Sequence, residues 1–295
     1  MVNEKISIDE LKQIARDLRI NTIETCFNAT SGHVGGSLSI VEMLVCLYFK
    51  YLNIDPNNPN KDDRDRFILS KGHAALSYVP CLAMRGFLDL EEVKSKFNKT
   101  NSKYGMHPDS KKINGCDCST GSLGHGLPIA CGMALGQKLK NSSSKVVVMT
   151  GDGELQEGSN YEALMSASFY KLNNLILIID RNKYEIDGST EEVMALEPLD
   201  EKLQAFGFNV ISINGNHMEE VDKALNEAFN NETSKPVCII SHTEKGMGLL
   251  GYQGKVTSHY VSLGDDKKVV DEMIEYIKKT DMDELSLNFN EMIFK

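Results

Sequence analysis

Val146-Val-Val-Met-Thr150, followed by Gly151-Asp-Gly153, and Leu175-Ile-Leu-Ile-Ile179, followed by Asp180-Arg-Asn182, are the two stretches that decide the fold of this chain. Each apolar run has the length and composition of a buried strand. About thirty residues separate the two motifs, which leaves room for one crossover helix between neighbouring parallel strands. The polar residues would then meet at the carboxyl ends of the strands, where open α/β sheets bind their ligands.

These polar residues are of the types that hold a magnesium ion on a diphosphate. Asp152 offers a carboxylate and Asn182 an amide oxygen, and Mg²⁺ keeps only one or two protein carboxylates when phosphates supply its other ligands. The neighbouring glycines allow close approach of the backbone, and a helix beginning near Glu157 or Gly158 would point its positive end at the anion. The alternative for Asp152 is an Asx turn that caps a helix.

The rest of the chain alternates between helical and strand patterns. A capping box, Ser7 with Glu10, begins a helix that runs to about Asn28. Further helices are expected at 126–140, 158–170, 199–206, 218–229 and 267–279, and strands at 210–213 and 237–241. We therefore expect an α/β fold, a mostly parallel sheet with helices on both faces. One domain spans residues 1–295, with 265–295 a C-terminal helix and tail. The tail after Thr280 shows no clear period, which leaves open whether it is partly mobile or lies on a partner.

The motifs resemble those of a known family. Gly-Asp-Gly followed about thirty residues later by Asn resembles the motif of thiamine diphosphate enzymes. Five segments narrow the resemblance to transketolase: Gly151-Asp-Gly-Glu-Leu-Gln-Glu-Gly158 with Tyr161-Glu-Ala163, Asp180-Arg-Asn-Lys-Tyr-Glu-Ile-Asp-Gly188, Ser31-Gly-His-Val-Gly-Gly36, Ile68-Leu-Ser-Lys-Gly-His73 and Ser119-Thr-Gly-Ser-Leu-Gly-His-Gly126. The match runs in order from about residue 10 to residue 265, and it implies the thiamine diphosphate-binding (PP) fold.

The length of the chain limits the number of domains that it can contain. In the family that it resembles, a complete transketolase has three domains in series. The 295 residues have room for only the first, the diphosphate-binding domain. The resemblance therefore implies the N-terminal subunit of a split transketolase. A separate C-terminal subunit would carry the pyrimidine-binding and C-terminal domains, with two copies of each chain in the assembly. The glutamate that activates the cofactor and the arginines that bind substrate phosphate are expected on that partner.

The resemblance also assigns roles to individual residues. Asp152 and Asn182, with the backbone carbonyl of Tyr184, would hold Mg²⁺, with Ca²⁺ or Mn²⁺ as substitutes. Thiamine diphosphate would contact His73, Gly121, Leu123, Gly153, Asn182 and His259. Catalytic roles fall on His33, His73, His107 and His259, with His33 and His107 in the substrate channel. Histidine suits these roles because its pKa of about 6.5 permits donor, acceptor and proton-carrier states near neutrality.

Three other features stay open. Lys245 is either a positive charge near the diphosphate or a solvated surface lysine. Glu157 and Glu162 match carboxylates near the family's subunit interface, but either could be a plain surface acid. Cys116-x-Cys118 lacks a second pair at zinc-finger spacing, which argues against a zinc site.

The implied activity is transfer of a two-carbon ketol unit from a ketose (phosphate) donor to an aldose (phosphate) acceptor. Two alternatives remain beside it. One is another thiamine diphosphate synthase, similar to 1-deoxyxylulose-5-phosphate synthase; Leu155-Gln-Glu-Gly158 and the His107-Pro108 step favour transketolase. The other is a non-catalytic scaffold subunit, against which the intact metal ligands and channel histidines argue.

Composition limits the partners. The formal charge of −10, from 32 basic and 42 acidic residues, argues against nucleic acid. No apolar stretch approaches the length of a membrane span, and the N-terminus lacks the pattern of a signal peptide. Seven cysteines read as free thiols of a cytoplasmic protein.

Two residues depart from the family pattern. Split transketolases often read Trp-His-Gly in the late loop, whereas this chain reads Thr257-Ser-His-Tyr-Val261, so that Tyr260 stands where glycine would leave space. Val34 stands where proline usually follows the first channel histidine. Both predict a donor other than the standard pentose and hexose phosphates, such as a modified or branched ketose. The alternative is that Tyr260 points into the partner interface and leaves the pocket unchanged.

Overall fold

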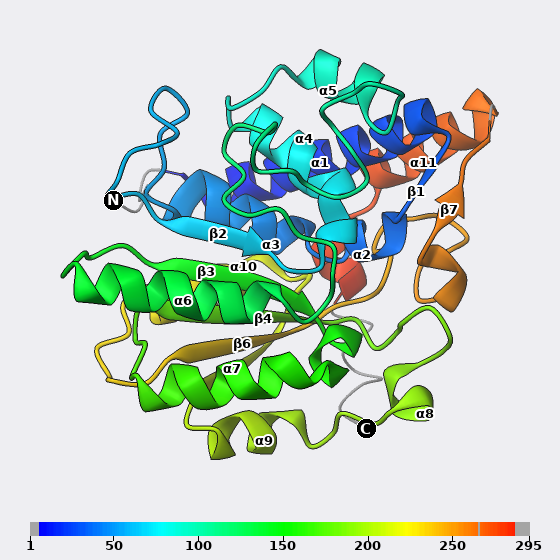
Figure 1. Ribbon diagram of the computed structural model, residues 1–295. Helices are drawn as coiled ribbons and strands as arrows, with labels where there is room; N and C mark the ends of the chain where they lie inside the picture. The colour runs from blue at the N-terminus through cyan, green and yellow to red at the C-terminus, as the bar shows by residue number, and fades with distance from the viewer. Residues whose placement is uncertain (1–5, 265, 287–295) are drawn as a thin grey trace.

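The structure, a computed structural model, describes residues 6–264 and 266–286. At its centre is a five-stranded sheet, ordered β2-β3-β4-β6-β5, in which all neighbouring strands are parallel (Figure 1). The strands are β2 (Arg66–Leu69), β3 (Val146–Gly151), β4 (Leu175–Arg181), β5 (Asn209–Asn214) and β6 (Val237–His242). β3 and β4 are neighbours joined by helix α7 (Gly158–Phe169), as the spacing of the two motifs predicts.

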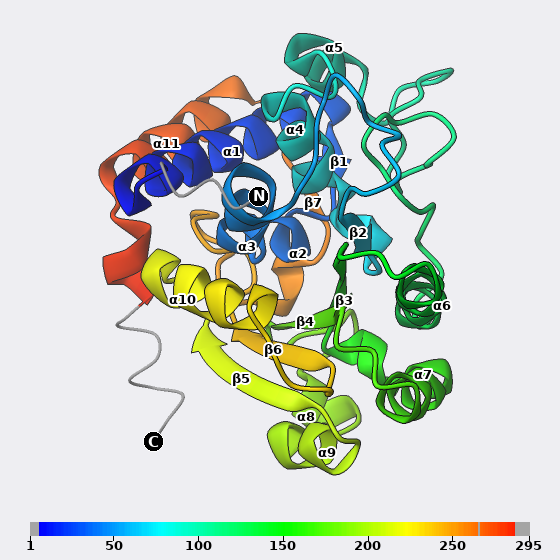
Figure 2. The same ribbon diagram turned by 90° about the vertical axis from the view of Figure 1, so that its left-hand side faces the viewer.

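Helices cover both faces of this sheet, which confirms the predicted fold class (Figure 2). One layer contains α1 (Ile8–Ala29), α2 (Val34–Leu38), α3 (Val41–Cys46), a π-helix (Leu47–Tyr51), α4 (Ala75–Met84), α10 (Met218–Phe229) and α11 (Lys267–Lys279). The other contains α6 (Gly126–Leu139), α7 and α9 (Leu199–Ala205). The short helices α5 (Leu90–Lys96) and α8 (Thr190–Val193) lie in connecting segments.

The central strands β3, β4 and β6 are apolar up to the polar residues at their carboxyl ends because both of their faces are buried. In β3, Val147 and Met149 join the core on the α1 side, while Val146 and Val148 join the core beneath α6 and α7. Side chains that alternate between two cores remove the apolar–polar alternation of a half-exposed strand. The sequence of β3 from Val146 to Met149 is therefore a continuous apolar run.

The N-terminal helix begins where its capping box predicts. The Ser7 hydroxyl accepts from the backbone of Glu10, and the Glu10 carboxylate accepts from the backbone of Ser7, an arrangement that contributes about 1 kcal/mol. After α1 the chain forms β1 (Ser31–Gly32), which pairs antiparallel with β7 (Val261–Ser262). This pairing brings the segment containing His33 beside the late loop containing His259.

Each helix and strand predicted above is present, with ends within two residues of the prediction. The tail after Thr280 is settled in part, because residues 281–286 pack on the chain itself. Met282 joins the α1-side core, Asp283 pairs with Lys12 at 2.8 Å, and Asn214 donates to Ser286 at 3.1 Å. This stretch is therefore anchored on its own chain. The remainder of the predicted tail, 287–295, lies outside the described residues.

Among residues 6–264 and 266–286, no helix combines the length and apolar character needed to cross a lipid bilayer.

Candidate active site

A cavity of about 490 Å³ opens at the carboxyl ends of β2, β3, β4 and β6. The loops that follow these strands supply most of its wall. The lining includes the residues named from the sequence: His33, His73, His107, His259, Gly121, Leu123, Gly153, Asp152, Asn182 and Tyr184. The structure thus brings together all residues for which a catalytic, cofactor or metal role is predicted.

Asp152 and Asn182 lie at the ends of adjacent strands. The Asp152 carboxylate is buried and accepts from the Gly153 amide at 2.9 Å, so it also caps the short 3₁₀ helix Gly153–Gln156. Burial raises the pKa of Asp152, although its ion pair with Arg181 opposes the shift. With the carbonyl of Tyr184, these residues present hard oxygen donors to one cavity. That donor set fits Mg²⁺.

A buried carboxylate that the sequence analysis did not single out orients Asn182. Asp180 is fully buried, and its carboxylate accepts from Lys71 Nζ at 2.5 Å, Thr243 Oγ1 at 2.5 Å and Ser39 Oγ at 2.8 Å. Burial is the largest single influence and opposes its charge, but Lys71 together with the hydrogen bonds from Thr243 and Asn182 outweighs burial and lowers the pKa of Asp180. Asn182 Nδ2 donates to the same carboxylate at 2.6 Å, which fixes the orientation of its amide.

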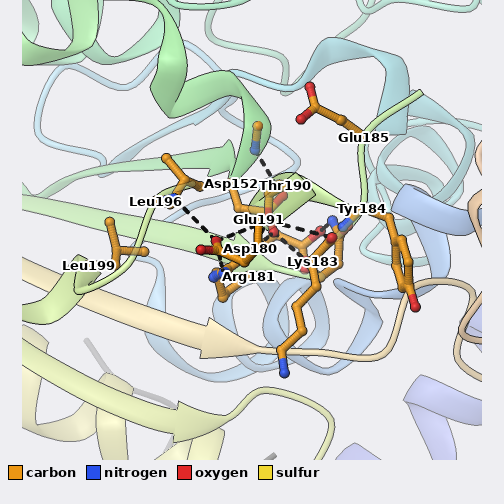
Figure 3. A network of polar contacts seen from close by, with 12 residues as sticks. Asp152, Asp180, Arg181, Lys183, Tyr184, Glu185, Thr190, Glu191, Leu196 and Leu199 are labelled. Atoms are coloured by element: carbon orange, nitrogen blue, oxygen red, sulfur yellow. Dashed lines mark hydrogen bonds and ion pairs between the residues drawn. The ribbon is translucent and has the colours of Figure 1, made fainter. Parts of the chain in front are cut away.

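Arg181 orients Asp152 in a comparable way, as Figure 3 shows. Its Nη1 donates to Asp152 Oδ2 at 3.0 Å, and the Lys183 amide donates to the same oxygen at 2.6 Å. Arg181 is itself buried beside three carboxylates. Burial alone would lower the pKa of Arg181, but the attraction of Asp152 and the hydrogen bonds to Glu197 and Asp152 raise it.

A second unpredicted carboxylate, Glu154, attaches the 120–124 loop to the end of β3. It is buried, and its oxygens accept from the amides of Gly124 and Gly151, each at 3.0 Å, and from the Ser70 hydroxyl. Gly121 in this loop has φ +143°, and a Cβ there would come within 2.8 Å of the His107 ring. The loop therefore has one closely specified path along the cavity.

The unpredicted residues Lys71, Glu154, Asp180 and Arg181 all lie inside segments that carry the family resemblance. Lys71 and Glu154 follow a strand, and Asp180 and Arg181 end one. All four are charged, so their sequence pattern is that of solvated turn residues. Only the long-range partners, such as Ser70 for Glu154, show that they are buried.

The four histidines of the site lie close together. The His33 ring centroid lies 5.3 Å from that of His73, 5.5 Å from His259 and 6.3 Å from His107. Burial, followed by His107 and Lys245, lowers the pKa of His33 to about 4. Burial is also the first cause that lowers the pKa of His73, of His107, and of His259 to about 3. At neutral pH the cluster is uncharged and can donate and accept hydrogen bonds.

Lys245 is not a solvated surface lysine. It is 2% exposed, and its Nζ donates to the carbonyl of Tyr184 at 2.7 Å and lies 2.9 Å from His259 Nδ1. Burial is the largest cause that lowers the pKa of Lys245 to about 8. Because the ammonium group can only donate, it places the proton of a neutral His259 on Nε2. Lys245 thus brings a cation to the cavity wall.

The two departures from the family pattern differ in their position. Tyr260 is exposed, its hydroxyl lies 2.8 Å from Ser31 Oγ, and its ring meets His33 edge-on at 5.0 Å. Its φ is not among the positive values of the described non-glycine residues, so the backbone there does not require glycine. Val34 is fully buried in the α1-side core and does not line the cavity.

Glu157 and Glu162 are both exposed on this chain. Glu157 lines the cavity, and Glu162 lines a second hollow between α6 and α7. Their proposed place at a subunit interface stays a prediction.

Comparison with known proteins gives consistent matches. Residues 10–278 match the family "Transketolase, thiamine diphosphate binding domain". The chain is 41% identical to an apulose-4-phosphate transketolase subunit of Actinobacillus succinogenes, covering 88% of this chain and 94% of that one. It is 39% identical to the 6-deoxy-6-sulfo-D-fructose transketolase subunit SqwG of a Clostridium species, with coverages of 87% and 93%.

Among solved structures, the transketolase of Campylobacter jejuni superposes with a TM-score of 0.84 at 33% identity. The superposition covers 94% of this chain but only 44% of that one. The chain therefore has the length of these separate transketolase subunits and less than half the length of a single-chain transketolase.

Proposed function

This chain belongs to the family of transketolase thiamine diphosphate-binding domains, and we propose that it is the N-terminal subunit of a two-chain transketolase. The enzyme would transfer a two-carbon ketol unit from a ketose (phosphate) donor to an aldose (phosphate) acceptor. The observation that carries the proposal is the single cavity in which Asp152, Asn182 and Tyr184 meet the four histidines.

The residues of the cavity fit thiamine diphosphate and a divalent cation. Asp152, Asn182 and the Tyr184 carbonyl would hold Mg²⁺, with Ca²⁺ or Mn²⁺ as substitutes that accept the same oxygen donors. The Gly153 amide and Lys245 would face the diphosphate, and Gly121 with Leu123 would lie along the organic part of the cofactor. When bound, thiamine diphosphate supplies the carbon nucleophile of ketol transfer.

The histidines would act on the sugar. Neutral His33 and His107 can donate to hydroxyls of the donor and to the carbonyl oxygen as it gains negative charge. His73 stacks with His259 at 5.5 Å, and His259 would present Nε2–H because Lys245 engages Nδ1. The cluster would therefore bind the substrate through hydrogen bonds without placing an additional charge in the channel.

The names of the relatives support a separate partner chain. The two relatives named as transketolase subunits match it over nearly their full length, whereas a single-chain transketolase is more than twice as long. We propose a heterotetramer with two copies of each chain, the partner carrying the pyrimidine-binding and C-terminal domains. Exposed apolar residues on α6 and α7 support an interface on this side: Ile129, Leu139, Tyr161, Met165 and Phe169.

The donor is proposed to be a modified or branched ketose. Two relatives act, by their names, on apulose 4-phosphate and 6-deoxy-6-sulfo-D-fructose, neither of which is a standard substrate of the family. In this chain, Tyr260 beside His33 is the residue that would select such a donor. Val34 is not part of the argument because its side chain is buried in the core. A cytoplasmic location is proposed as well, in line with seven free cysteines.

The split-subunit proposal is tested by assaying the purified chain with and without its partner at saturating thiamine diphosphate and magnesium. The chain alone should be inactive, because the activating glutamate is expected on the partner, and addition of the partner should restore turnover. Robust ketol transfer by the chain alone would contradict the proposal.

A further inference from the structure

Three consecutive residues at the end of β4 serve two separate networks. Side chains alternate along a strand, so Asp180 and Arg181 point to opposite faces of β4, and Asn182 follows directly after the strand. Asp180 holds Asn182 at 2.6 Å, whereas Arg181 reaches Asp152 on the neighbouring strand at 3.0 Å. The two proposed metal ligands are therefore oriented from opposite faces of the same strand.

Arg181 uses all three of its nitrogens. Nη1 donates to Asp152 Oδ2 and, at 2.7 Å, to Thr190 Oγ1. Nη2 donates to Glu191 Oε1 at 2.8 Å and to Glu197 Oε1 at 3.0 Å, and Nε donates to the same Glu197 oxygen at 3.2 Å. One buried cation thus joins Asp152 to three side chains of the following loop (Figure 3).

That loop, the 183–197 segment, forms one wall of the cavity through Tyr184, Glu185, Ile186, Asp187 and Met194. Its first amide, that of Lys183, donates to Asp152 Oδ2 at 2.6 Å. Within the segment, the Thr190 amide donates to the Lys183 carbonyl at 2.9 Å, and the Leu196 amide donates to Glu191 Oε1 at 3.2 Å. The path of the segment and the orientation of Asp152 therefore depend on the same side chain.

We propose that Arg181 is a positioning residue that couples the ordering of the 183–197 segment to the metal-binding geometry of Asp152. The inference rests on the proposed thiamine diphosphate–magnesium site. The planar guanidinium suits this role because its donors are fixed in direction and can serve Asp152 and α8 together, whereas a lysine would supply one point charge. Cofactor binding and ordering of this cavity wall are then one cooperative event.

Substitution of Thr190 and Glu191, the partners of Arg181 on α8, distinguishes this coupling from simple compensation of the charge on Asp152. Glu191 is 41% exposed, and an isolated pair with such a residue contributes little. If Arg181 only balances the charge of Asp152, then Glu191→Gln and Thr190→Ala leave cofactor affinity unchanged. If Arg181 couples the segment to Asp152, both substitutions weaken cofactor binding. Glu192→Gln is the matched control, because Glu192 lies next to Glu191 on α8 but accepts from Ser189 at 2.7 Å.

The test measures binding of thiamine diphosphate with Mg²⁺ to the complex of the chain and its partner by calorimetry, together with hydrogen exchange of the 183–197 segment. We expect Glu191→Gln and Thr190→Ala to weaken binding by about 10-fold and Arg181→Lys by up to about 100-fold, the range found for residues that orient metal ligands. Exchange in the cofactor-free segment should rise in all three variants. Glu192→Gln should match wild type in both measurements.

Thermal unfolding of each variant establishes that it is folded, and Glu191→Gln keeps the test valid if Arg181→Lys does not fold. A wild-type complex that binds the cofactor, with Glu191→Gln and Thr190→Ala binding equally well, would overturn the coupling and leave the proposed function intact. A wild-type complex that binds no thiamine diphosphate would overturn the proposed function, and the inference with it.

Discussion

The hydroxyl of Tyr260 lies 2.8 Å from Ser31 Oγ, across the small antiparallel pair formed by β1 and β7. The contact joins residues from opposite ends of the chain and holds the Tyr260 ring edge-on to His33 at 5.0 Å. Tyr260 therefore contacts His33, a residue of the proposed substrate channel, although it is not itself among the residues that line the cavity. In the alternative interpretation, a partner chain covers the exposed part of the side chain.

Tyr260→Gly should broaden donor use toward xylulose 5-phosphate, because it removes the ring beside His33. Tyr260→Phe is the matched control, since it keeps the ring and loses only the hydrogen bond to Ser31. The measurement is kcat/KM of the reconstituted enzyme on xylulose 5-phosphate and on a panel of modified ketose phosphates. Ordinary efficiency of wild type on xylulose 5-phosphate, with an unchanged ranking in Tyr260→Gly, would refute the specificity role.

Asp152→Ala should abolish tight binding of the metal and cofactor, whereas Asn182→Ala should have a smaller effect. A carboxylate facing a dication is attracted more strongly than a neutral amide at the same distance. We expect a loss of more than about 100-fold for Asp152→Ala, since even residues that only orient metal ligands contribute about 10- to 100-fold. Calorimetric titration of the reconstituted enzyme measures both. Unchanged affinity in Asp152→Ala would place the metal elsewhere.

Glu42→Ala should destabilise the fold by about 3–5 kcal/mol, because it leaves Arg19 as an unpaired buried charge. Arg19 is fully buried, its Nη1 and Nη2 donate to Glu42 at 2.6 and 2.9 Å, and its Nε donates to the Met247 carbonyl at 3.2 Å. Glu24→Ala is the control, because its pair with Lys94 is partly exposed and should contribute less than about 1 kcal/mol. Urea denaturation compares the two; equal losses would contradict the assignment of the buried pair.

Acid should destabilise the protein in part through His242. Burial, followed by Arg181 and Lys183, lowers the pKa of His242 to about 4, whereas an unfolded histidine has a pKa of about 6.5. Above pH 6.5 His242 is neutral in both the folded and the unfolded protein, so it adds no pH dependence to the free energy of unfolding. Between about pH 6.5 and 4 only the unfolded state binds the proton, so the free energy of unfolding falls as the pH falls, by at most about 1.4 kcal/mol per unit.

His242→Gln should remove the contribution of His242 to the pH dependence of the free energy of unfolding. Denaturant unfolding of wild type and variant at pH 7.5, 5.5 and 4.5 measures the difference between the two slopes. Because His33 and His259 also have lowered pKa values, the stability of His242→Gln should still fall in acid, but less steeply than that of wild type. Parallel pH profiles for the two proteins would show that His242 makes no contribution.

The sequence predicts best those parts of the fold in which burial of apolar side chains alone determines the residue pattern. β3, β4 and β6 are apolar runs between turns, and α10 and α11 have one buried face and one solvated face. Helices α2, α3 and α4 were not predicted, because they are buried on all sides and lack an amphipathic period. The four-residue strand β2 was also missed, being too short for a pattern to register.

The candidate site also contains residues that the sequence reveals and residues that it does not. Asp152, Asn182 and the histidines are recognisable because the family motifs contain them. The residues that orient these side chains cannot be recognised from the sequence, since a lysine or glutamate after a strand is normally solvated. Lys71, Glu154 and Lys245 become buried only through partners that are distant in sequence, such as Asp180 for Lys71. Predicting them requires the three-dimensional arrangement of the loops.

Because all five strands of the sheet run in the same direction, the residues proposed for catalysis gather at one end, and the turns entering the strands lie at the other. The turn at 230–236 leads into β6, a six-residue strand that spans about 20 Å. Ser234 in that turn is exposed, while six of the seven native thiols are buried and Cys118 is partly covered. A cysteine introduced at position 234 would therefore provide an attachment point for a fluorophore or a solid support on the side of the molecule remote from the cavity.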